Sequence, residues 1–289
     1  VSSFIMSDTA LKIGETATVT IVFSEAVVGF ASNDDVEVPN GTLSSMTTSD
    51  DINWTGTYTP NADVEELSNV LTLGTSWTDT AGNAGSPATT ANFTIDTQAP
   101  TVSSFTMSDT ALKIGGTATV TIIFSEAVVG FASNVDVAVP NGILTPMTTS
   151  DNISWTGVYT PTAGVEDATN ELILGTDWTD TAGNTGSSAT TANFTIDTLE
   201  PTIVTDIHGN PVSMSDTELI KGDTATVTII FSEAVAGFAS NDDVTVPNGT
   251  LSPMTSFDNI LWTGTYTPNA DVEDATNELI LGTDWTDTA

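Results

Sequence analysis

The sequence predicts an all-β protein built from three tandem β-sandwiches, and two observations carry this prediction. The first is internal repetition, because Trp54 recurs as Trp155 and again as Trp262, after shifts of 101 and then 107 residues. A repeat of about 100 residues is large enough to form one domain. The second is the alternation of apolar residues with threonine, a period of two that is typical of half-buried strands. We therefore expect three repeated domains, 1–97, 98–198 and 199–289.

Strand signals occur along the whole of the first repeat. The clearest runs from Thr16 to Phe23, where every second residue is apolar and β-branched residues are frequent. Three further segments have strand character: 52–58, 70–77 and 91–95. Asn40-Gly41 is a typical turn sequence between strands. Residues 64–69, VEELSN, are the only place where a helical turn fits, and we expect a connection there.

The number and spacing of these segments favour one kind of sandwich. Short strands with turn signals about 8 to 12 residues apart, in a domain of about 100 residues, are typical of an antiparallel Greek-key sandwich of the immunoglobulin type. Two closely related junctions, FTIDTQAP at 93–100 and FTIDTLEP at 194–201, join the repeats. Because such short linkers leave little room for the domains to fold back, we expect an elongated rod.

The third repeat departs from the other two in two ways. It carries a six-residue insert near 203–213, and its sequence ends before a counterpart of 194–197. We therefore expect the third repeat to lack its last strand. A sandwich that lacks a strand either exposes a sheet edge or is completed by a neighbouring molecule.

The net charge of the chain limits the kinds of partner that it can bind. There are 38 acidic residues against 3 lysines and one histidine, which gives a formal net charge of −35. Nucleic acid is excluded as a partner, because its binding depends on lysine and arginine side chains that replace phosphate counterions. Anionic membranes are disfavoured for the same reason, and no apolar run approaches the roughly 18 residues of a membrane-spanning helix. Such acidity is typical of a solvated surface, of a saline habitat or of carboxylates that bind cations.

The acidic side chains are expected to gather at the two junctions. In an immunoglobulin-type sandwich, the loops after the second and sixth strands lie at the N-terminal end, where the preceding domain arrives. The first junction is therefore predicted to combine Asp96, Glu65 and Glu66 of the first repeat with Glu126, Asp180 and Asn184 of the second. The second junction is predicted to combine Asp197, Glu200, Glu166 and Asp167 of the second repeat and its linker with Glu233 and Asp287 of the third.

Carboxylates that converge on one place destabilise the folded chain unless a cation neutralises them. Two of them about 4 Å apart repel by about 4 kcal/mol at an effective dielectric constant of about 20. Carboxylate and amide oxygens suit the hard ion Ca²⁺, whereas zinc and copper prefer histidine and cysteine, of which the chain has one and none. We therefore expect Ca²⁺ at the junctions. The alternative is that Asp79, Asp180 and Asp287 cap turns through their side chains and that Asp96 is a solvated linker residue.

Other candidate groups have simpler interpretations. The recurrence of Trp54 and Trp77 at fixed places in every repeat favours core packing over a sugar-binding platform. His208 is predicted to be exposed in a loop. With one histidine and no arginine, the chain offers no combination of nucleophile, base and orienting group, so we expect no enzyme activity. The three lysines are expected to be surface charges or to neutralise acidic groups: Lys12, Lys113 and Lys221.

The recurring motifs also carry a resemblance. Segments such as TALKIGETATVTIVFSEAVVGF, INWTGTYTPNADVEE, WTDTAGN and FTIDTQAPT resemble the bacterial Ig-like domains of giant repetitive adhesins, over nearly the whole chain. That resemblance implies a non-catalytic stalk, secreted or on the bacterial cell surface, that is exported by type I secretion with RTX-type signals. It also implies calcium-stiffened junctions, a monomeric array whose partners are the neighbouring repeats, and a role in cell adhesion or biofilm formation. Two alternatives stay open: a module that binds a glycan or a protein, and the stalk of a secreted hydrolase.

Overall fold

In the computed structural model of the protein, residues 1–288 are described, and the chain divides into two compact units. The first unit comprises Val1–Thr110, Thr117–Thr160 and Thr169–Phe194, so it holds the first repeat and most of the second. The second unit comprises Ala111–Gly116, Pro161–Ala168 and the chain from Thr195 onward, so it holds the third repeat. Among the described residues, no helix is long and apolar enough to cross a membrane.

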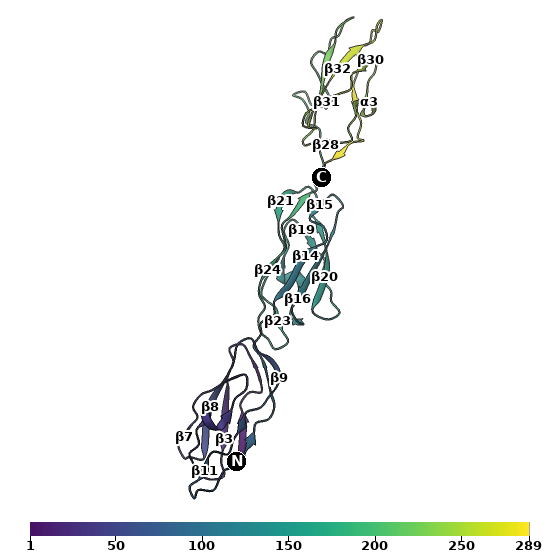
Figure 1. Cartoon of the computed structure of the whole chain (residues 1–289). Coiled ribbons are helices and arrows are strands. Elements are labelled where there is room, and N and C mark those ends of the chain that lie inside the picture. The colour runs from purple at the N-terminus through teal and green to yellow at the C-terminus, as the bar shows by residue number, and fades with distance from the viewer. Residues whose placement is uncertain (289) are drawn as a thin grey trace. The chain divides into compact units, whose positions relative to one another are not determined.

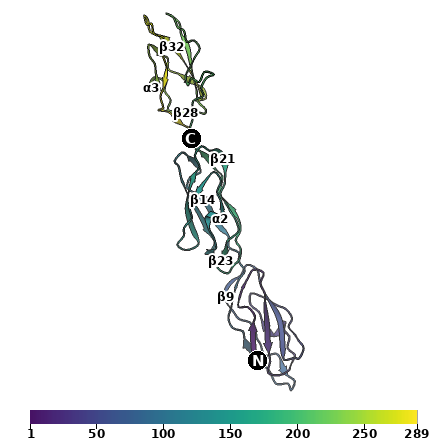
Figure 2. The same ribbon diagram turned by 180° about the vertical axis from the view of Figure 1, so that it is seen from behind.

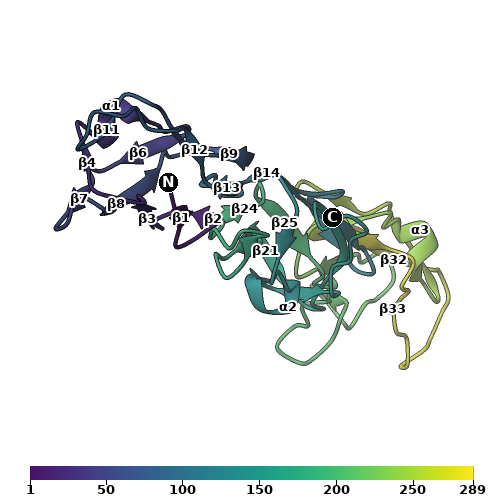
Figure 3. The ribbon, with the colours of Figure 1, turned by 90° about the horizontal axis from the view of Figure 1, so that it is seen from below.

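The first repeat is a sandwich of short strands, drawn in purple and blue in Figure 1. Its elements are β1 (Ser3–Met6), β2 (Ala10–Lys12), β3 (Ala17–Val22), β4 (Val27–Val28), α1 (Ser32–Asp35), β5 (Val36–Glu37), β6 (Gly41–Leu43), β7 (Thr47–Thr48), β8 (Asn53–Pro60), β9 (Glu65–Asn69), β10 (Thr72–Leu73), β11 (Thr78–Asp79), β12 (Ala88–Thr89) and β13 (Phe93–Asp96). The larger sheet has the order β1-β3-β8-β6, with β7 also pairing β8, and Figure 3 shows β1, β3 and β8 side by side. Three smaller sheets complete the repeat: β12-β10-β5, β2-β13-β9 and β11-β4.

The core of the first repeat follows from alternation along its strands. In β3, Val19 and Ile21 are fully buried, whereas Thr18 is exposed and Thr20 is half-buried. From β13, Phe93 and Ile95 enter the same core at 1% and 0% exposure. The Phe93 ring meets the ring of Tyr58 edge-on, with centroids 5.3 Å apart. β13 is therefore a core strand as well as the segment that leads into the next repeat.

The second repeat has the same arrangement of strands. Its elements are β14 (Val102–Met107), β15 (Ala111–Lys113), β16 (Ala118–Phe124), β17 (Val128–Val129), α2 (Ser133–Asp136), β18 (Val137–Ala138), β19 (Gly142–Leu144), β20 (Ser154–Pro161), β21 (Glu166–Asn170), β22 (Ile173–Leu174), β23 (Thr179–Asp180), β24 (Ala189–Thr190) and β25 (Phe194–Asp197). The sheets are β14-β16-β20-β19, β15-β25-β21, β17-β23 and β18-β22-β24. Figure 2 shows β9 of the first repeat close to β23, and both belong to the first unit.

The third repeat keeps the larger sheet but has fewer strands elsewhere. Its elements are β26 (Ser213–Met214), β27 (Ala225–Ile230), β28 (Val235–Ala236), α3 (Ser240–Asp243), β29 (Val244–Thr245), β30 (Gly249–Leu251), β31 (Thr255–Ser256), β32 (Leu261–Pro268), β33 (Ile280–Leu281) and β34 (Thr286–Asp287). The larger sheet is β26-β27-β32-β30 with β31 beside β32, and two pairs follow, β28-β34 and β29-β33. The last strand among the described residues is β34.

Most of the predicted strands are present, and one prediction is wrong. Residues 64–69 do not form a connection with a helical turn, because Glu65–Asn69 is the strand β9. β9 pairs antiparallel with β13. Pairing with a neighbouring strand, rather than the local pattern of apolar residues, makes this segment extended. The predicted rod stays a prediction.

The tryptophans confirm the predicted core packing. Trp77 and Trp178 are 6% and 0% exposed, and Trp54 packs half-buried against the same core as Trp77.

The sequence analysis did not predict the helical turns α1, α2 and α3, which share one hydrogen-bond pattern. In α1, the buried carboxylate of Asp35 accepts a hydrogen bond of 2.7 Å from the backbone N–H of Ala31. This Asp is followed by a strand, so the turn does not continue into a longer helix.

Candidate cation sites

A five-residue turn of the pattern Asp-x-x-Gly-Asn shapes the loop after β23 in the second repeat. The Asp180 Oδ1 atom accepts hydrogen bonds from the backbone N–H groups of Gly183, at 2.7 Å, and Asn184, at 2.9 Å. Gly183 has φ +92°, a left-handed conformation that favours glycine. The predicted capping role is confirmed for Asp180. It is also confirmed for Asp79, whose Oδ1 accepts the backbone N–H of Asn83 at 2.8 Å.

Asn184 links the second repeat directly to the first. Its Oδ1 accepts the backbone N–H of Ile13 at 2.9 Å, and its Nδ2 donates to the backbone oxygen of Asp96, also at 2.9 Å. The side chain is only 3% exposed, so these bonds are protected from water. Asn83, its equivalent in the first repeat, is exposed and donates to Asp79 within its own turn. The sequence predicts Asn184 as a ligand, and the structure shows it as a bridge between main-chain segments.

Three carboxylates converge beside this bridge. One oxygen atom each of Asp96, Glu126 and Asp180 lies within 4.8 Å of the other two. Asp96 ends β13 of the first repeat, Glu126 follows β16, and Asp180 ends β23. Asp180 is fully buried, whereas the other two are half-buried. Two strands of the second repeat and one of the first thus deliver like charges to one place.

This crowding changes the protonation of the group. Burial, followed by the charges of Asp180, Asp96 and Glu65, raises the pKa of Glu126 from 4.5 to about 7. Burial also raises the pKa of Asp96, and the charges of Asp180 and Glu65 act in the same direction. With this pKa, Glu126 ionises close to neutral pH. A bound cation would favour the ionised form.

The neighbours of Asp96 on both sides are set by strand register. On β9, Glu65 lies opposite Asp96, while Glu66 lies opposite Ile95 and accepts the backbone N–H of Ser68. The structure thus brings Glu65 toward the three carboxylates and leaves Glu66 outside. On the other side, β2 places Lys12 opposite Asp96. Lys12, Glu65 and Asp96 line one recess of ≈ 290 Å³.

The second unit contains the equivalent group. Asp197, Glu233 and Asp287 each place one carboxylate oxygen within 4.8 Å of the others. Burial raises the pKa of Glu233, and the charges of Asp287, Asp197 and Glu166 add to this. The Glu233 Oε1 atom is buried and has no hydrogen-bond partner among the described residues. A buried acceptor without a donor is costly, and a cation would satisfy it.

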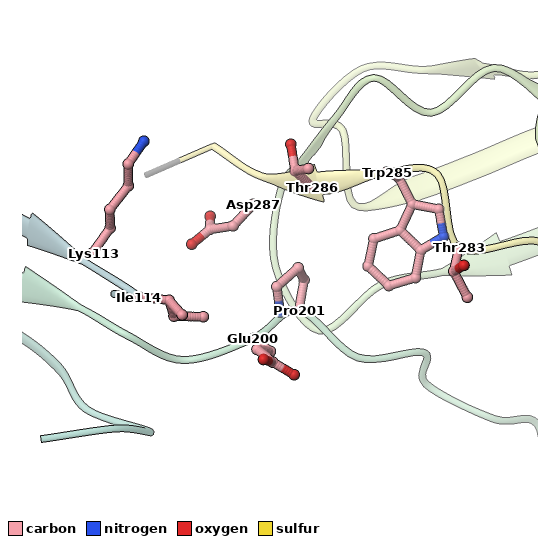
Figure 4. Close-up of a pocket in the computed structure, with 8 residues that line it drawn as sticks. All are labelled: Lys113, Ile114, Glu200, Pro201, Thr283, Trp285, Thr286 and Asp287. Carbon is pink, nitrogen blue, oxygen red and sulfur yellow. The ribbon is translucent and has the colours of Figure 1, made fainter. Parts of the chain in front are cut away.

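The other predicted residues of the second junction lie around this group. Figure 4 shows Lys113, Glu200 and Asp287 among the residues that line a pocket of ≈ 490 Å³. Glu166 lies near enough to raise the pKa of Glu233, as above. Asp167, the next residue of β21, is not one of the three grouped carboxylates.

The insert of the third repeat contains a further turn of the same pattern. The Asp206 Oδ1 accepts the backbone N–H groups of His208 and Asn210, at 2.8 and 2.9 Å. These bonds, led by those of Asn210, lower the pKa of Asp206. His208 is exposed, which confirms the prediction from the sequence. This loop therefore forms the same Asp-capped turn as the loop after β23.

The spacing of oxygen atoms in each of the two carboxylate clusters fits a calcium ion. Ca²⁺ binds oxygen ligands at about 2.3–2.6 Å, so two ligands of one ion are at most about 5 Å apart. The 4.8 Å limit within each group satisfies this requirement. The ion takes six to eight ligands, and water or main-chain oxygens would complete the shell around these carboxylates.

Comparison with known proteins identifies the repeats. The bacterial Ig-like domain matches three times along the sequence, at residues 2–95, 96–196 and 197–289. The chain belongs to the bacterial Ig-like domain family. Its three bacterial Ig-like repeats account for almost every residue. The sequence has no match among curated proteins.

Several solved structures resemble the tandem at low identity. FdeC, an Escherichia coli adhesin, is 14% identical over 97% of this chain and 96% of its own, with a TM-score of 0.35. The I9–I11 tandem of titin is 8% identical over 99% and 95%, with a TM-score of 0.30. Invasin, a bacterial integrin-binding protein, is 14% identical over 93% of this chain and 54% of its own, with a TM-score of 0.31.

Proposed function

We propose that the chain is a non-catalytic spacer segment of a bacterial surface or secreted adhesin, stiffened by Ca²⁺ at its repeat junctions. The observation that most supports this proposal is that a cluster of three carboxylates recurs at equivalent positions of successive repeats. Asp96, Glu126 and Asp180 form the first group, and the second is Asp197, Glu233 and Asp287. A group that recurs with the repeat serves the architecture rather than one reaction.

The proposed ion would act by joining carboxylates that belong to successive repeats. Asp96 reaches the first group from β13, and the other two members come from the second repeat. Without a cation their mutual repulsion pushes the repeats apart, while Ca²⁺ holds them together. Asn184 would keep Asp96 in place through its hydrogen bond to the main chain. Export by type I secretion with RTX-type signals, and service in cell adhesion or biofilm formation, belong to the same proposal.

Thermal unfolding tests the role of calcium. An ion that binds the folded chain but not the unfolded chain stabilises it by about 2.7 kcal/mol at a free concentration of 100 times its Kd. We expect a higher Tm in millimolar CaCl₂ than in EDTA, two ions per chain by isothermal titration calorimetry, and a longer particle by small-angle scattering. Equal concentrations of MgCl₂ serve as a control, because Mg²⁺ demands a tighter octahedral shell. Superimposable melting curves in CaCl₂ and EDTA would refute the calcium proposal.

A further inference from the structure

The outer face of the larger sheet in the third repeat carries a row of four apolar side chains. Ile230 of β27 lies directly opposite Leu261 of β32. The backbone N–H of Val204 donates to the backbone oxygen of Ile230 at 2.8 Å, which places Val204 on the other side of Ile230. Phe257 directly follows β31, the strand beside β32 in Figure 1, and lines one hollow of ≈ 360 Å³ together with Leu261. We call Val204, Ile230, Leu261 and Phe257 the apolar row.

The members of the apolar row face away from the core. Side chains alternate between the two faces of a strand, and both chain neighbours of Ile230 are buried. Ile230, Leu261 and Val204 are 38%, 44% and 47% exposed, and Phe257 is fully exposed. Single exposed apolar side chains are common on protein surfaces. Side chains opposite one another on neighbouring strands are about 4.5–5.5 Å apart at Cβ, so these four form a continuous apolar strip.

Three of the four positions are polar in the other two repeats. The equivalents are Ser2, Val22, Asn53 and Ser49 in the first repeat and Ser103, Ile123, Ser154 and Ser150 in the second. Both of these repeats form the same larger sheet with polar side chains at those positions. The fold therefore does not require the apolar row, and its side chains are available for contact with another molecule.

Carboxylates border the apolar row. Asp258 is exposed and lines the same hollow. Its Oδ1 accepts the backbone N–H of Leu261 at 3.0 Å, and this bond leads those that lower the pKa of Asp258. Asp206, two residues beyond the first member of the row, also has a lowered pKa. Lys221, the lysine of the third repeat, precedes β27, whereas the row lies at the C-terminal end of that strand.

We propose that the apolar row is a binding site for a partner protein whose contact surface presents apolar side chains bordered by lysine or arginine. Aromatic side chains are enriched in the cores of protein interfaces, and a rim of opposite charge speeds and orients association. A second copy of this chain fits poorly, because each copy carries a net charge of −35 and the same acidic border. A glycan needs hydrogen-bonding groups that hydrocarbon side chains lack, and an anionic membrane would be repelled. This site would add recognition to the proposed spacer and does not depend on calcium.

The test uses the full chain and a fluorescently labelled amphipathic peptide of leucine and lysine, LKKLLKLLKKLLKL, followed by fluorescence anisotropy. EDTA removes calcium, and about 0.3 M NaCl shortens the Debye length below about 8 Å, which suppresses diffuse attraction to the acidic chain. We expect saturation at one peptide per chain. The control peptide SKKSSKSSKKSSKS keeps the charges without the apolar face, and it should bind at least about tenfold more weakly.

Two triple variants exchange the apolar row between repeats. Val204→Ser, Phe257→Ser and Leu261→Ser together install the residues of the second repeat, and they should weaken peptide binding at least about tenfold. Ser103→Val, Ser150→Phe and Ser154→Leu together build the row in the second repeat, and saturation should then rise to two peptides per chain. Circular dichroism and thermal melting of both variants check that the sandwiches remain folded.

A pair of single variants tests the acidic border. Asp258→Asn keeps the oxygen that accepts the turn hydrogen bonds and removes one charge, so it should weaken peptide binding about two- to fivefold. Asp151→Asn makes the same change at the equivalent turn of the second repeat, where Ser150 and Ser154 replace the apolar side chains, and it should bind like the unaltered chain.

Four results would overturn the proposal. They are equal binding of the two peptides, unchanged affinity of the serine variant, saturation that stays at one peptide when the row is built in the second repeat, and equal effects of the two asparagine variants. Dimers in sedimentation velocity that the serine variant abolishes would assign the row to a second copy. Binding to uncharged phosphatidylcholine vesicles that is lost in the same variant would assign it to a membrane, and either assignment also overturns the proposal.

Discussion

The substitution Glu126→Gln tests how strongly the repulsion among Asp96, Glu126 and Asp180 destabilises the folded chain. In the folded chain the pKa of Glu126 is raised from 4.5 to about 7. Ionisation of Glu126 therefore destabilises the folded state, an effect that is absent below pH 4.5 and complete above about pH 7. A pKa difference of this size corresponds to about 3 kcal/mol without solvent screening, because each pKa unit equals about 1.4 kcal/mol. Water screens this half-buried group, so we expect about 1 kcal/mol.

The assay is differential scanning calorimetry in EDTA at pH 5 and pH 8. At pH 8 the glutamine variant should melt about 2–4 °C above the unaltered chain, the shift expected for about 1 kcal/mol in 150–250 residues. At pH 5 the two should nearly coincide, since Glu126 is then largely protonated. With millimolar CaCl₂ the order should reverse, because the variant has lost a charged ligand of the proposed ion.

A matched control exists in the same chain. Glu25 occupies the equivalent position in the first repeat, where it is exposed. Glu25→Gln should leave Tm unchanged at both pH values. The electrostatic reasoning is wrong if Glu126→Gln lowers Tm at pH 8 in EDTA, or if its Tm difference from the unaltered chain is the same at pH 5 and pH 8.

Two further predictions concern the bridge and the core. Asn184→Ala removes the hydrogen bonds to Ile13 and Asp96, which should cost about 1–3 kcal/mol in calorimetric unfolding because buried partners are left unsatisfied. Asn83→Ala, which alters the equivalent exposed turn, should cost less than half as much, and equal losses would argue against a bridging role. Burial raises the pKa values of Tyr58 and Tyr159 to about 12. Spectroscopic titration should therefore show neither phenol ionising near pH 10, and an ordinary titration of all tyrosines at that pH would contradict the buried core.

The fold could be predicted because its signals are local and repeated. Alternation from Thr16 to Phe23 marks β3, and the spacing of the tryptophans marks the repeats. β9 could not be predicted in this way. Its residues face solvent for most of their length, so apolar alternation is absent, and only its pairing with β13 makes it a strand. Tertiary pairing overrode the local preference.

The candidate site was predictable in its composition but not in its detail. Topology predicts Glu126 and Asp180 at the N-terminal end of the second sandwich, where Asp96 arrives from the first. The choice of Glu65 over Glu66 depends on register, because a shift of one residue along a strand reverses the face on which a side chain lies. The bridge made by Asn184 depends on how closely two domains approach, and no sequence period encodes that distance.

The bonds of Asn184 go to main-chain atoms of the preceding repeat, at Ile13 and Asp96. Every residue except proline offers a backbone N–H, and every residue offers a backbone oxygen. The asparagine thus recognises the path of the neighbouring chain and is indifferent to most of its side chains. A gene that duplicates, deletes or shuffles such repeats would keep this contact wherever the path is kept. Variation in copy number can therefore proceed without coordinated changes on both sides of each new joint.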